Sequence, residues 1–332
     1  MSSNEKPIVF HYDGSIFSHR VLWYLWLRGI PYDECIQPAF MPRPDLGLIG
    51  VGYRKIPIMA IGKDVYCDSR LIISTLESLY PNNTLSPSRP ADVGIGKLFE
   101  SWTINGGIFT NAVKMMPYWQ EASFLSNEAF IDDRQKLMGT RFTAQGMQAG
   151  RPEGAQHLQQ AFDLLETTFL ADGRDWILNT QEPSLADIDA VWPFKWLISD
   201  LKMKDSLPAE HFNAKKYPKL FAWVERFVTQ LNEKKETLPK PNALDGKTMG
   251  KRIIDTTTAQ ETIPFDDDNS HGFKQGEDVE ISPSDYGQTG KTAGTLIGLT
   301  VHEVVIRNSK GIHVHFPRWN FAISRAASKS KI

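Results

Sequence analysis

The sequence predicts three successive units: an α/β domain at the N-terminus, an all-helical bundle, and a small all-β extension at the C-terminus. Three observations support this prediction. As far as Tyr80, short β-rich runs alternate with helical apolar patterns. From residue 91 to about 236, apolar residues recur at helical spacing, and after residue 243 short β-rich runs return. We therefore expect units at residues 1–80, 91–236 and 243–332, separated by proline-rich linkers.

The composition bounds the class of protein. The chain has 332 residues, 37 basic and 39 acidic side chains, and a formal net charge of −2. Because the charges are interspersed, we expect neither nucleic acid nor a membrane as a partner. No apolar run approaches the roughly 20 residues of a spanning helix, and Cys35 and Cys67 fit buried thiols better than a disulfide scaffold. These features predict a cytoplasmic protein, although Ser330-Lys331-Ile332 differs from a peroxisomal signal only at its last position.

The first unit is predicted element by element. A strand at 8–12 and a turn at Asp13-Gly14-Ser15 lead into a helix that Gly29 and Pro31 end. A second strand at 32–36 is followed by a loop, a hairpin turning at Gly62-Lys63-Asp64, and a helix after Asp68-Ser69. This order is that of a thioredoxin-like domain.

Two short motifs near the end of this unit indicate a ligand site. Pro57 cannot donate to a strand ladder, so the backbone beside it in Lys55-Ile56-Pro57 is available to a ligand's peptide group. Ser69 is expected at the N-cap of the next helix, where free amides bind carboxylates. Taken singly, the first motif also fits a core strand and the second an ordinary cap. Together they predict a docking surface.

These motifs resemble the glutathione site of cytosolic glutathione transferases, the GST superfamily. The resemblance implies a cis proline, a backbone contact from Ile56 to the cysteinyl part of glutathione, and contacts from Asp68 and Ser69 to its γ-glutamyl end. Many members have Glu where this chain has Asp68. The predicted glutathione-binding residues are Lys55, Ile56, Pro57, Asp68 and Ser69.

The resemblance extends over roughly residues 7 to 231. In the second unit, Ser184-Leu185-Ala186-Asp187 has the form of a capping box and resembles the box in the transferases' helical domain. The fold expected is therefore a thioredoxin-like α/β domain plus an all-α bundle, the GST fold. By the same resemblance we expect a homodimer.

Three hydroxyl groups are candidates for activating the glutathione thiol. A thiol with a pKa of ~8.5 is only roughly 3% ionised at pH 7, and lowering that pKa by two units requires about 2.7 kcal/mol. Ser15 stands where the family's SPFxxRV motif has its catalytic serine, with Ile16 replacing the proline. Ser18 and Tyr12 are the alternatives. Each serine also fits a helix N-cap, and Tyr12 also fits the core.

The first long helix of the second unit is expected to line the substrate cleft, by resemblance. An ordinary bundle core is the alternative for many of these residues. The predicted substrate-binding residues are Trp102, Asn105, Phe109, Met116 and Trp119. No metal is predicted, because His302, His313 and His315 would form a site only if their strand faces coincide.

The C-terminal extension has no counterpart in standard transferases. Residues 243–275 are poor in apolar side chains and are expected to be extended. Four short strands then suggest a small barrel or meander packed against the bundle, which shapes or covers the pocket or else serves as a structural module. Truncation after Asn242 is expected to leave glutathione binding intact. Such a tail resembles a fungal-type variant of the family.

Three functions are compatible with this sequence. The first is a glutathione S-transferase that adds glutathione thiolate to a hydrophobic electrophilic substrate, with fungal secondary-metabolite biosynthesis as the setting suggested by analogy. The second is a glutathione-dependent cis–trans isomerase or eliminating enzyme. The third is a non-catalytic glutathione-binding, structural or regulatory protein.

Overall fold

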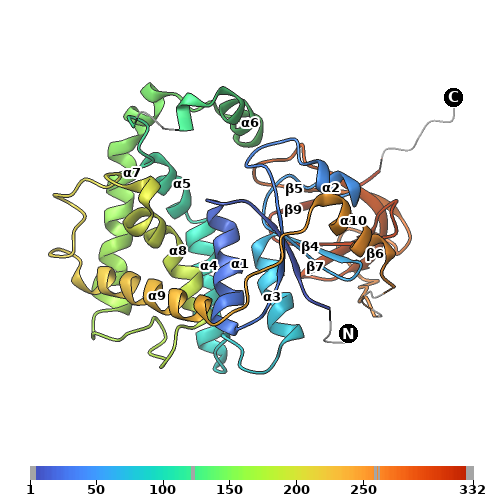
Figure 1. Cartoon of the computed structure of the whole chain (residues 1–332), viewed down its shortest axis with the longest axis horizontal. Helices are drawn as coiled ribbons and strands as arrows, with labels where there is room; N and C mark the ends of the chain where they lie inside the picture. Colours follow the sequence, from blue (N-terminus) through green and yellow to red (C-terminus); the bar gives the residue numbers. More distant parts are fainter. Residues whose placement is uncertain (1–4, 121–123, 258–259, 261, 327–332) are drawn as a thin grey trace.

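The computed structural model describes residues 5–120, 124–257, 260 and 262–326. A helical bundle forms one side of the molecule and a large sheet the other, with helices α1 (Ile16–Arg28) and α3 (Ser69–Leu79) between them (Figure 1). Within the described ranges, no helix has the length and apolar character needed to cross a membrane.

The N-terminal unit follows the predicted order with one addition. Its other elements are β1 (Ile8–His11), β2 (Asp33–Ile36), α2 (Pro44–Leu48), β3 (Ile58–Ile61) and β4 (Asp64–Cys67). Strand β1 pairs in parallel with β2 and antiparallel with β3, and β3 and β4 form the predicted hairpin. The sequence predicts only a loop over residues 38–52, but the structure has helix α2 there. Pro44 in its first turn is preorganised for a helix and Asp45 complements the helix dipole.

The second unit is helical, as predicted. Its elements are α4 (Pro90–Ile104), α5 (Ile108–Lys114), α6 (Glu128–Met138), α7 (Ala144–Leu164), α8 (Leu185–Ser199) and α9 (Pro218–Glu236), with short turns η1 (Phe124–Ser126), η2 (Leu165–Phe169) and η3 (Leu201–Met203). The capping box is confirmed, because Ser184 and Asp187 bond reciprocally at the start of α8. The prediction of a single long first helix is wrong. It is divided into α4 and α5, and Gly107 between them has a φ of +90°, which favours glycine.

The extension joins the sheet of the N-terminal unit. Its strands are β5 (Asp278–Pro283), β6 (Thr292–Leu299), β7 (Glu303–Arg307), β8 (His313–Pro317) and β9 (Phe321–Arg325). The sheet order is β2-β1-β3-β4-β8-β7-β6-β5-β9, and β8 pairs in parallel with β4. Strands β5 to β8 form the meander alternative of the prediction, but they extend the N-terminal sheet and do not form a compact β unit held against the bundle. Pairing with β8 satisfies the backbone groups of β4, which would otherwise be an open sheet edge.

The segment before these strands also differs from the prediction. Residues 243–275 contain helix α10 (Gly246–Asp255), which packs beside α2. Asp245 caps it by accepting a hydrogen bond from the Thr248 amide, and Met249 and Ile253 are buried. The apolar stripe of this helix is short, so the low overall apolar content of the segment concealed it.

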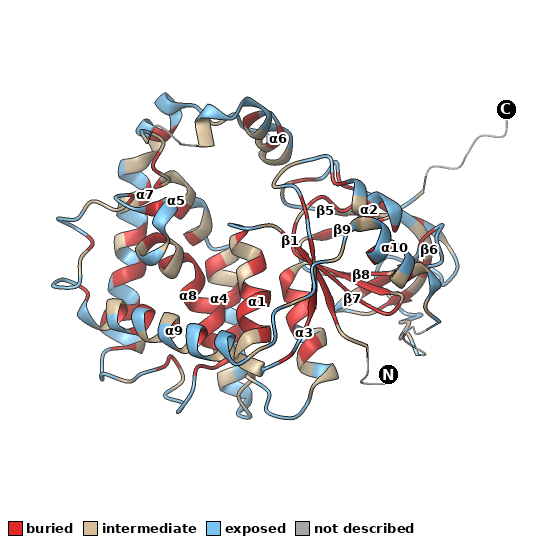
Figure 2. Cartoon of the chain, viewed as in Figure 1, coloured by how far each residue is buried: buried red, intermediate tan, exposed pale blue. Residues whose placement is uncertain are grey.

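Strands β1, β3 and β4 are buried on both faces of the sheet, and each of these faces belongs to a different hydrophobic cluster (Figure 2). Val9 and Met59 pack towards the helical bundle, whereas Phe10 and Ile58, their neighbours along the strands, pack towards the extension. Alternate residues of a strand point to opposite faces, so the nearly continuous apolar runs of β1 and β3 require cover on both sides. The predicted burial of Cys35 and Cys67 is confirmed.

Candidate active site

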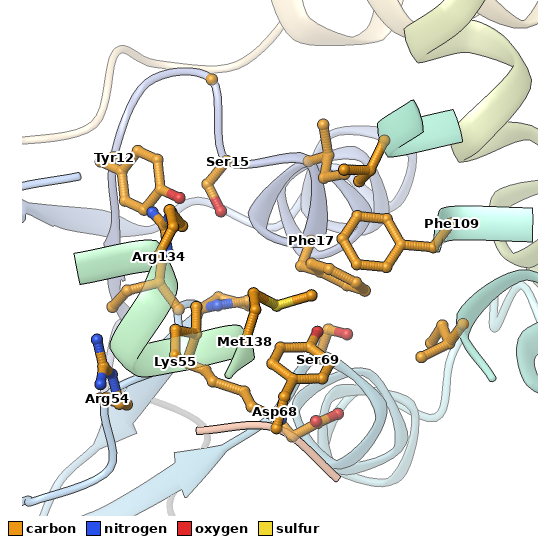
Figure 3. Close-up of a pocket in the computed structure, with 18 of the residues that line it drawn as sticks. Tyr12, Ser15, Phe17, Arg54, Lys55, Asp68, Ser69, Phe109, Arg134 and Met138 are labelled. Atoms are coloured by element: carbon orange, nitrogen blue, oxygen red, sulfur yellow. The ribbon is translucent and has the colours of Figure 1, made fainter. Parts of the chain in front are cut away.

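A pocket lies where the three units meet. It is lined by the loop before α1, the residues before β3, the start of α3, helices α5 and α6, and the loop between β5 and β6 (Figure 3). Nine of the predicted site residues line it: Tyr12, Ser15, Lys55, Ile56, Pro57, Asp68, Ser69, Phe109 and Met116. The structure thus brings together the predicted thiol-activating and glutathione-binding residues, which are up to 57 positions apart in the sequence.

Ser15 lies at the N-cap of α1, at the end of the helix where the amide dipoles are positive. The Ser18 hydroxyl donates a 2.8 Å hydrogen bond to Ser15 Oγ, and the Ser18 amide contacts the same oxygen at 3.4 Å. Since Ser15 Oγ already accepts these bonds, its own proton is free to be donated into the pocket. Ser18 is fully buried and does not line the pocket.

Tyr12 is the third hydroxyl candidate. It precedes Ser15 by one turn of the chain and lines the same pocket, and the Arg43 guanidinium lies over its ring, 5.8 Å from the centroid. Figure 3 shows Tyr12 and Ser15 together on one side of the pocket. The arrangement places Ser15 at the helix N-terminus and Tyr12 just outside it.

The two motifs predicted to bind glutathione have the expected backbone geometry with one correction. The Ile56-Pro57 peptide bond is cis, as the family resemblance implies. The first residue of β3 is Ile58, so the Ile56 backbone lies outside the strand. The N-cap of α3 is Asp68, not Ser69: Asp68 has a φ of 77° and its carboxylate accepts from the Arg70 amide at 2.9 Å. Asp caps helices as well as Ser does, whereas its positive φ with a ψ of 135° lies outside the left-handed helical region and is strained for a residue other than glycine.

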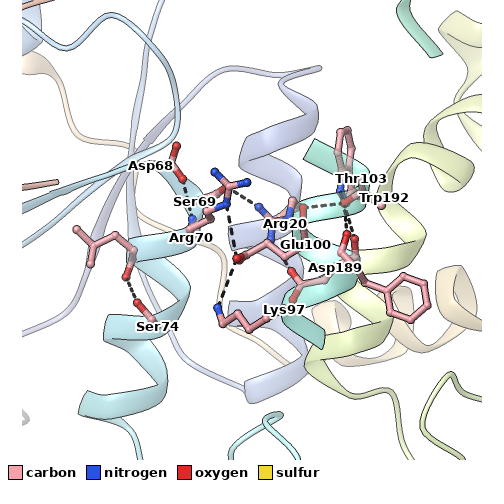
Figure 4. Close-up of polar contacts among 12 residues, drawn as sticks. Arg20, Asp68, Ser69, Arg70, Ser74, Lys97, Glu100, Thr103, Asp189 and Trp192 are labelled. Carbon is pink, nitrogen blue, oxygen red and sulfur yellow. Dashed lines mark hydrogen bonds and ion pairs between the residues drawn. The ribbon is translucent and has the colours of Figure 1, made fainter. Parts of the chain in front are cut away.

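Ser69 is held by a buried ionic network that the motifs do not reveal. Arg20 is fully buried and donates from Nη1 to Ser69 Oγ at 2.7 Å and from Nη2 to Asp189 at 2.5 Å (Figure 4). Burial by itself lowers the pKa of Arg20, but the carboxylates of Asp189 and Glu100 outweigh this and raise the pKa. Glu100 also forms an ion pair with Arg70, at 3.5 Å. Arg20 stands within the SIFSHRV motif, but its partners lie 49, 80 and 169 positions away.

The apolar part of the pocket is formed by aromatic side chains of three helices. The rings of Phe17 and Phe109 meet edge to face with centroids 5.0 Å apart, and both contact Trp192. Phe130 of α6 and Met116 line the pocket as well. Helix α6 was not predicted to contribute to the pocket.

Three predicted substrate residues do not line this pocket. Trp102 packs against Phe99 in the bundle core, with ring centroids 5.9 Å apart. Asn105 accepts a hydrogen bond from Arg70. Trp119 is about half exposed and stacks under Arg151. The break between α4 and α5 changes the helix face, so residues on either side of it no longer share one wall.

Helix α6 is fastened over the pocket by charged side chains. Asp133 pairs with Arg54 at 2.6 Å and accepts from the Met41 amide at 3.2 Å. Arg134 donates to the Ala39 carbonyl at 2.7 Å and lines the pocket. Among the residues that the structure describes, five basic ones line the pocket, Arg43, Arg54, Lys55, Arg70 and Arg134, against two acidic ones, Asp68 and Asp285. Arg54, Lys55 and Arg70 are paired with Asp133, Asp285 and Glu100, so the positive charge of the pocket comes mainly from Arg43 and Arg134.

Within the part of the chain that the structure describes, Asp64, His313 and His315 form a group that could hold a metal ion. Their potential ligand atoms lie within 4.8 Å of one another, at the joint between β4 and β8. Hydrogen bonds already account for this geometry, because Asp64 Oδ1 contacts His315 Nε2 at 2.9 Å and His313 Nδ1 at 3.2 Å. His302 is exposed and is not part of the group.

Comparisons with known proteins agree with the fold. Residues 9–84 match the family described as glutathione S-transferase, N-terminal domain, and residues 111–236 match a domain of unknown function, DUF7962. Glutathione S-transferase U3 of Arabidopsis thaliana is 28% identical over 86 residues, which are 26% of this chain and 38% of that protein. Glutathione S-transferase U4 of the same plant is 25% identical over 91 residues, 27% of this chain and 41% of that protein. The chain therefore spans about two fifths of the length of the curated relatives it matches.

Solved structures extend the likeness to the whole chain. A GST-like protein from Pseudomonas syringae is similar with a TM-score of 0.68 and 20% identity, over 97% of this chain and 100% of that one. A glutathione S-transferase from Sinorhizobium meliloti gives a TM-score of 0.50 at 14% identity, over 69% of this chain and 91% of that one. The chain has a glutathione-transferase-like fold with a strand-rich C-terminal extension. The match of residues 9–84 and the two curated relatives support the glutathione S-transferase superfamily.

Proposed function

We propose that this protein is a glutathione-dependent enzyme of the serine type, which uses glutathione thiolate against an apolar electrophile. The observation that carries the proposal is the position of Ser15 Oγ, at the N-cap of α1 in a pocket that also contains cis-Pro57, Asp68 and Ser69. The free amides at the start of α3 suit the carboxylate at the γ-glutamyl end of glutathione. The wall of Phe17, Phe109 and Met116 suits an apolar second substrate.

The proposed chemistry follows from the free proton of Ser15. Its hydroxyl donates to the glutathione sulfur and favours the thiolate, while the Ser18 hydroxyl stabilises the Ser15 oxygen from behind. A hydrogen bond to a charged group contributes roughly 1.5–3 kcal/mol, enough with the helix dipole to lower the thiol pKa by about two units. The thiolate then adds to an electrophilic carbon. Release of the adduct gives a conjugate, and later expulsion of the thiol gives an isomerised or eliminated product.

The test is the ultraviolet absorbance of bound glutathione thiolate as a function of pH. The wild-type protein is expected to ionise the thiol about two pH units below ~8.5. In Ser15→Ala, the pKa of the bound thiol is expected to return towards ~8.5 while glutathione still binds. The rate at which a model electrophile is conjugated is expected to fall in proportion to the lost thiolate. Tyr12→Phe is the matched control and is expected to leave the titration unchanged.

Two results would contradict the proposal. An unshifted thiol in the wild-type protein would indicate a glutathione-binding protein without activation of the thiol. A shift lost in Tyr12→Phe and retained in Ser15→Ala would assign the activating hydroxyl to the tyrosine. Thermal unfolding of both variants checks their folding, because loss of the Ser15 cap costs roughly 1 kcal/mol.

A further inference from the structure

The loop between β5 and β6, residues 284–291, brings an acidic side chain to a predicted glutathione-binding residue. Asp285 Oδ1 lies 2.6 Å from Lys55 Nζ, and the same ammonium group lies over the ring of Tyr286, 3.8 Å from its centroid. All three residues line the pocket. The Lys55 side chain is only 13% exposed, so solvent screens this ion pair less than it would a surface pair. The charge of Lys55 is therefore already compensated from within the chain.

The loop is held in this position from two sides. On the bundle side, the Gly287 amide donates to the Leu137 carbonyl of α6 at 2.8 Å. On the sheet side, Arg54 donates to Thr289 at 3.3 Å, and a Cβ on Gly290 would stand 2.9 Å from the Arg54 backbone nitrogen. Such close backbone approach admits only glycine without a shift. Asp285 is thus fixed beside Lys55 by its own loop.

The direction of the proposed ligand places a carboxylate near this pair. The γ-glutamyl end of glutathione is assigned to Asp68 and Ser69, and its cysteinyl part to the Ile56 backbone. The remaining end of the tripeptide carries the glycine carboxylate, and Lys55 is the cation adjoining Ile56. A fixed Asp285 carboxylate repels a second carboxylate that approaches Lys55, because like charges at such separations oppose each other by kilocalories in a partly buried site.

We propose that Asp285 is a specificity-determining residue, which disfavours a free carboxylate at the end of the thiol ligand that lies beside Lys55. Thiols in which this end is esterified, amidated or otherwise uncharged are favoured. This inference rests on the proposed function, since it concerns the ligand of the same site. It assigns to the C-terminal extension a direct role in choosing the ligand.

The experiment compares two ligands on three proteins by isothermal titration. The ligands are glutathione and its monoethyl ester, esterified at the glycine carboxylate. The proteins are the wild type, Asp285→Asn, which keeps a hydrogen-bonding partner for Lys55 but removes the negative charge, and Asp267→Asn. The last variant is the matched control, because Asp267 is an exposed acidic residue of the same extension that does not line the pocket.

In the wild type, the ester is expected to bind at least as tightly as glutathione. Asp285→Asn is expected to tighten glutathione about tenfold, as the loss of a near charge–charge repulsion predicts, and to change ester binding less than twofold. Asp267→Asn should change neither the affinity for glutathione nor the affinity for the ester. If Asp285→Asn leaves the ratio of the two affinities unchanged, or weakens the binding of glutathione, the proposed role of Asp285 is wrong. The proposed glutathione site is not contradicted by that result. If neither ligand binds any of the three proteins, both the proposed function and this inference are overturned.

Discussion

Arg20 Nη1 donates a 2.7 Å hydrogen bond to Ser69 Oγ, and so joins α1 to the first residue of α3 in the interior of the molecule. The same guanidinium bonds Asp189 of α8 at 2.5 Å. One buried cation therefore links the thioredoxin-like unit, the helical bundle and a predicted glutathione-binding serine. The orientation of Ser69 depends on how the two units pack.

Replacing Arg20 by methionine is expected to destabilise the protein and to weaken glutathione binding. The substitution leaves Asp189 buried without its cation, whereas Glu100 keeps Arg70 as a partner, and breaking a buried ion pair costs about 3–5 kcal/mol. Urea unfolding and isothermal titration measure the two effects. The control is Arg89→Met, whose side chain is 78% exposed and which should change the unfolding free energy by less than about 0.5 kcal/mol. If Arg20→Met lowers the unfolding free energy by less than about 1 kcal/mol, the ionic network does not stabilise the fold.

The His315 cluster predicts a pH dependence of stability. His315 contacts Asp64 at 2.9 Å and Glu303 at 2.8 Å, its ring stacks near Tyr66, and His313 shares Asp64. Burial alone lowers the pKa of His315, but the two carboxylates outweigh it and raise the pKa above 6.5. A raised pKa stabilises the fold fully below 6.5, and this contribution is lost as pH rises through the folded pKa.

The measurement is urea unfolding of the wild type and His315→Gln between pH 5 and 9. The variant is expected to be less stable by about 3 kcal/mol at low pH, with a smaller difference at high pH. His302→Gln, an exposed histidine of the same extension, is the control and should follow the wild type. At acid pH a separate loss of stability is expected. His313 and His315 lower the pKa of Asp64 despite its burial, so the stability that the Asp64 carboxylate contributes is lost as the pH falls through this lowered pKa. Identical pH slopes for the wild type and His315→Gln would contradict the assignment.

Gly52 is expected to tolerate no side chain. A Cβ at this position would lie 1.9 Å from the Lys291 carbonyl oxygen, at the end of the loop that carries Asp285. Gly52→Ala should therefore displace that loop and destabilise the protein by about 2 kcal/mol or more, as overpacking does. The matched control is Gly47→Ala, where nothing lies within 4 Å, and this change in an exposed position of α2 should be neutral or slightly stabilising. Equal stability of the two variants would show that the loop does not pack as described.

Truncation after Asn242 is expected to abolish cooperative folding. The sequence alone predicts that such a truncation spares glutathione binding, but the structure reverses this expectation. Removing the extension exposes the face of the sheet that carries Phe10 and Ile58, and it opens the edge of β4. Near-ultraviolet circular dichroism and thermal unfolding test the prediction. A truncated protein with a sharp thermal transition and unchanged glutathione affinity would restore the picture of an independent tail.

Most of the N-terminal unit could be predicted because its signals are local. Gly29 ends α1 in the left-handed conformation, and the cis-Pro57 motif and the Ser184 capping box each depend on a few adjacent residues. Backbone geometry at a turn, a cap or a proline is set by steric and hydrogen-bonding preferences within about one turn of chain. The errors at this level were small, such as the shift of the α3 cap from Ser69 to Asp68.

The place of the extension and the closure of the pocket were decided only by tertiary structure. The sequence indicated strands after residue 243, but pairing of Asp64 with His313 joins segments 249 residues apart. The short motif around Arg20 gave no sign of its distant partners, and the contact of Asp285 with Lys55 is equally long-range. Local sequence patterns indicate which face of a helix or strand is apolar. The burial of the second face of a strand, and the neutralisation of a buried charge, depend on which distant segment of the chain packs against it.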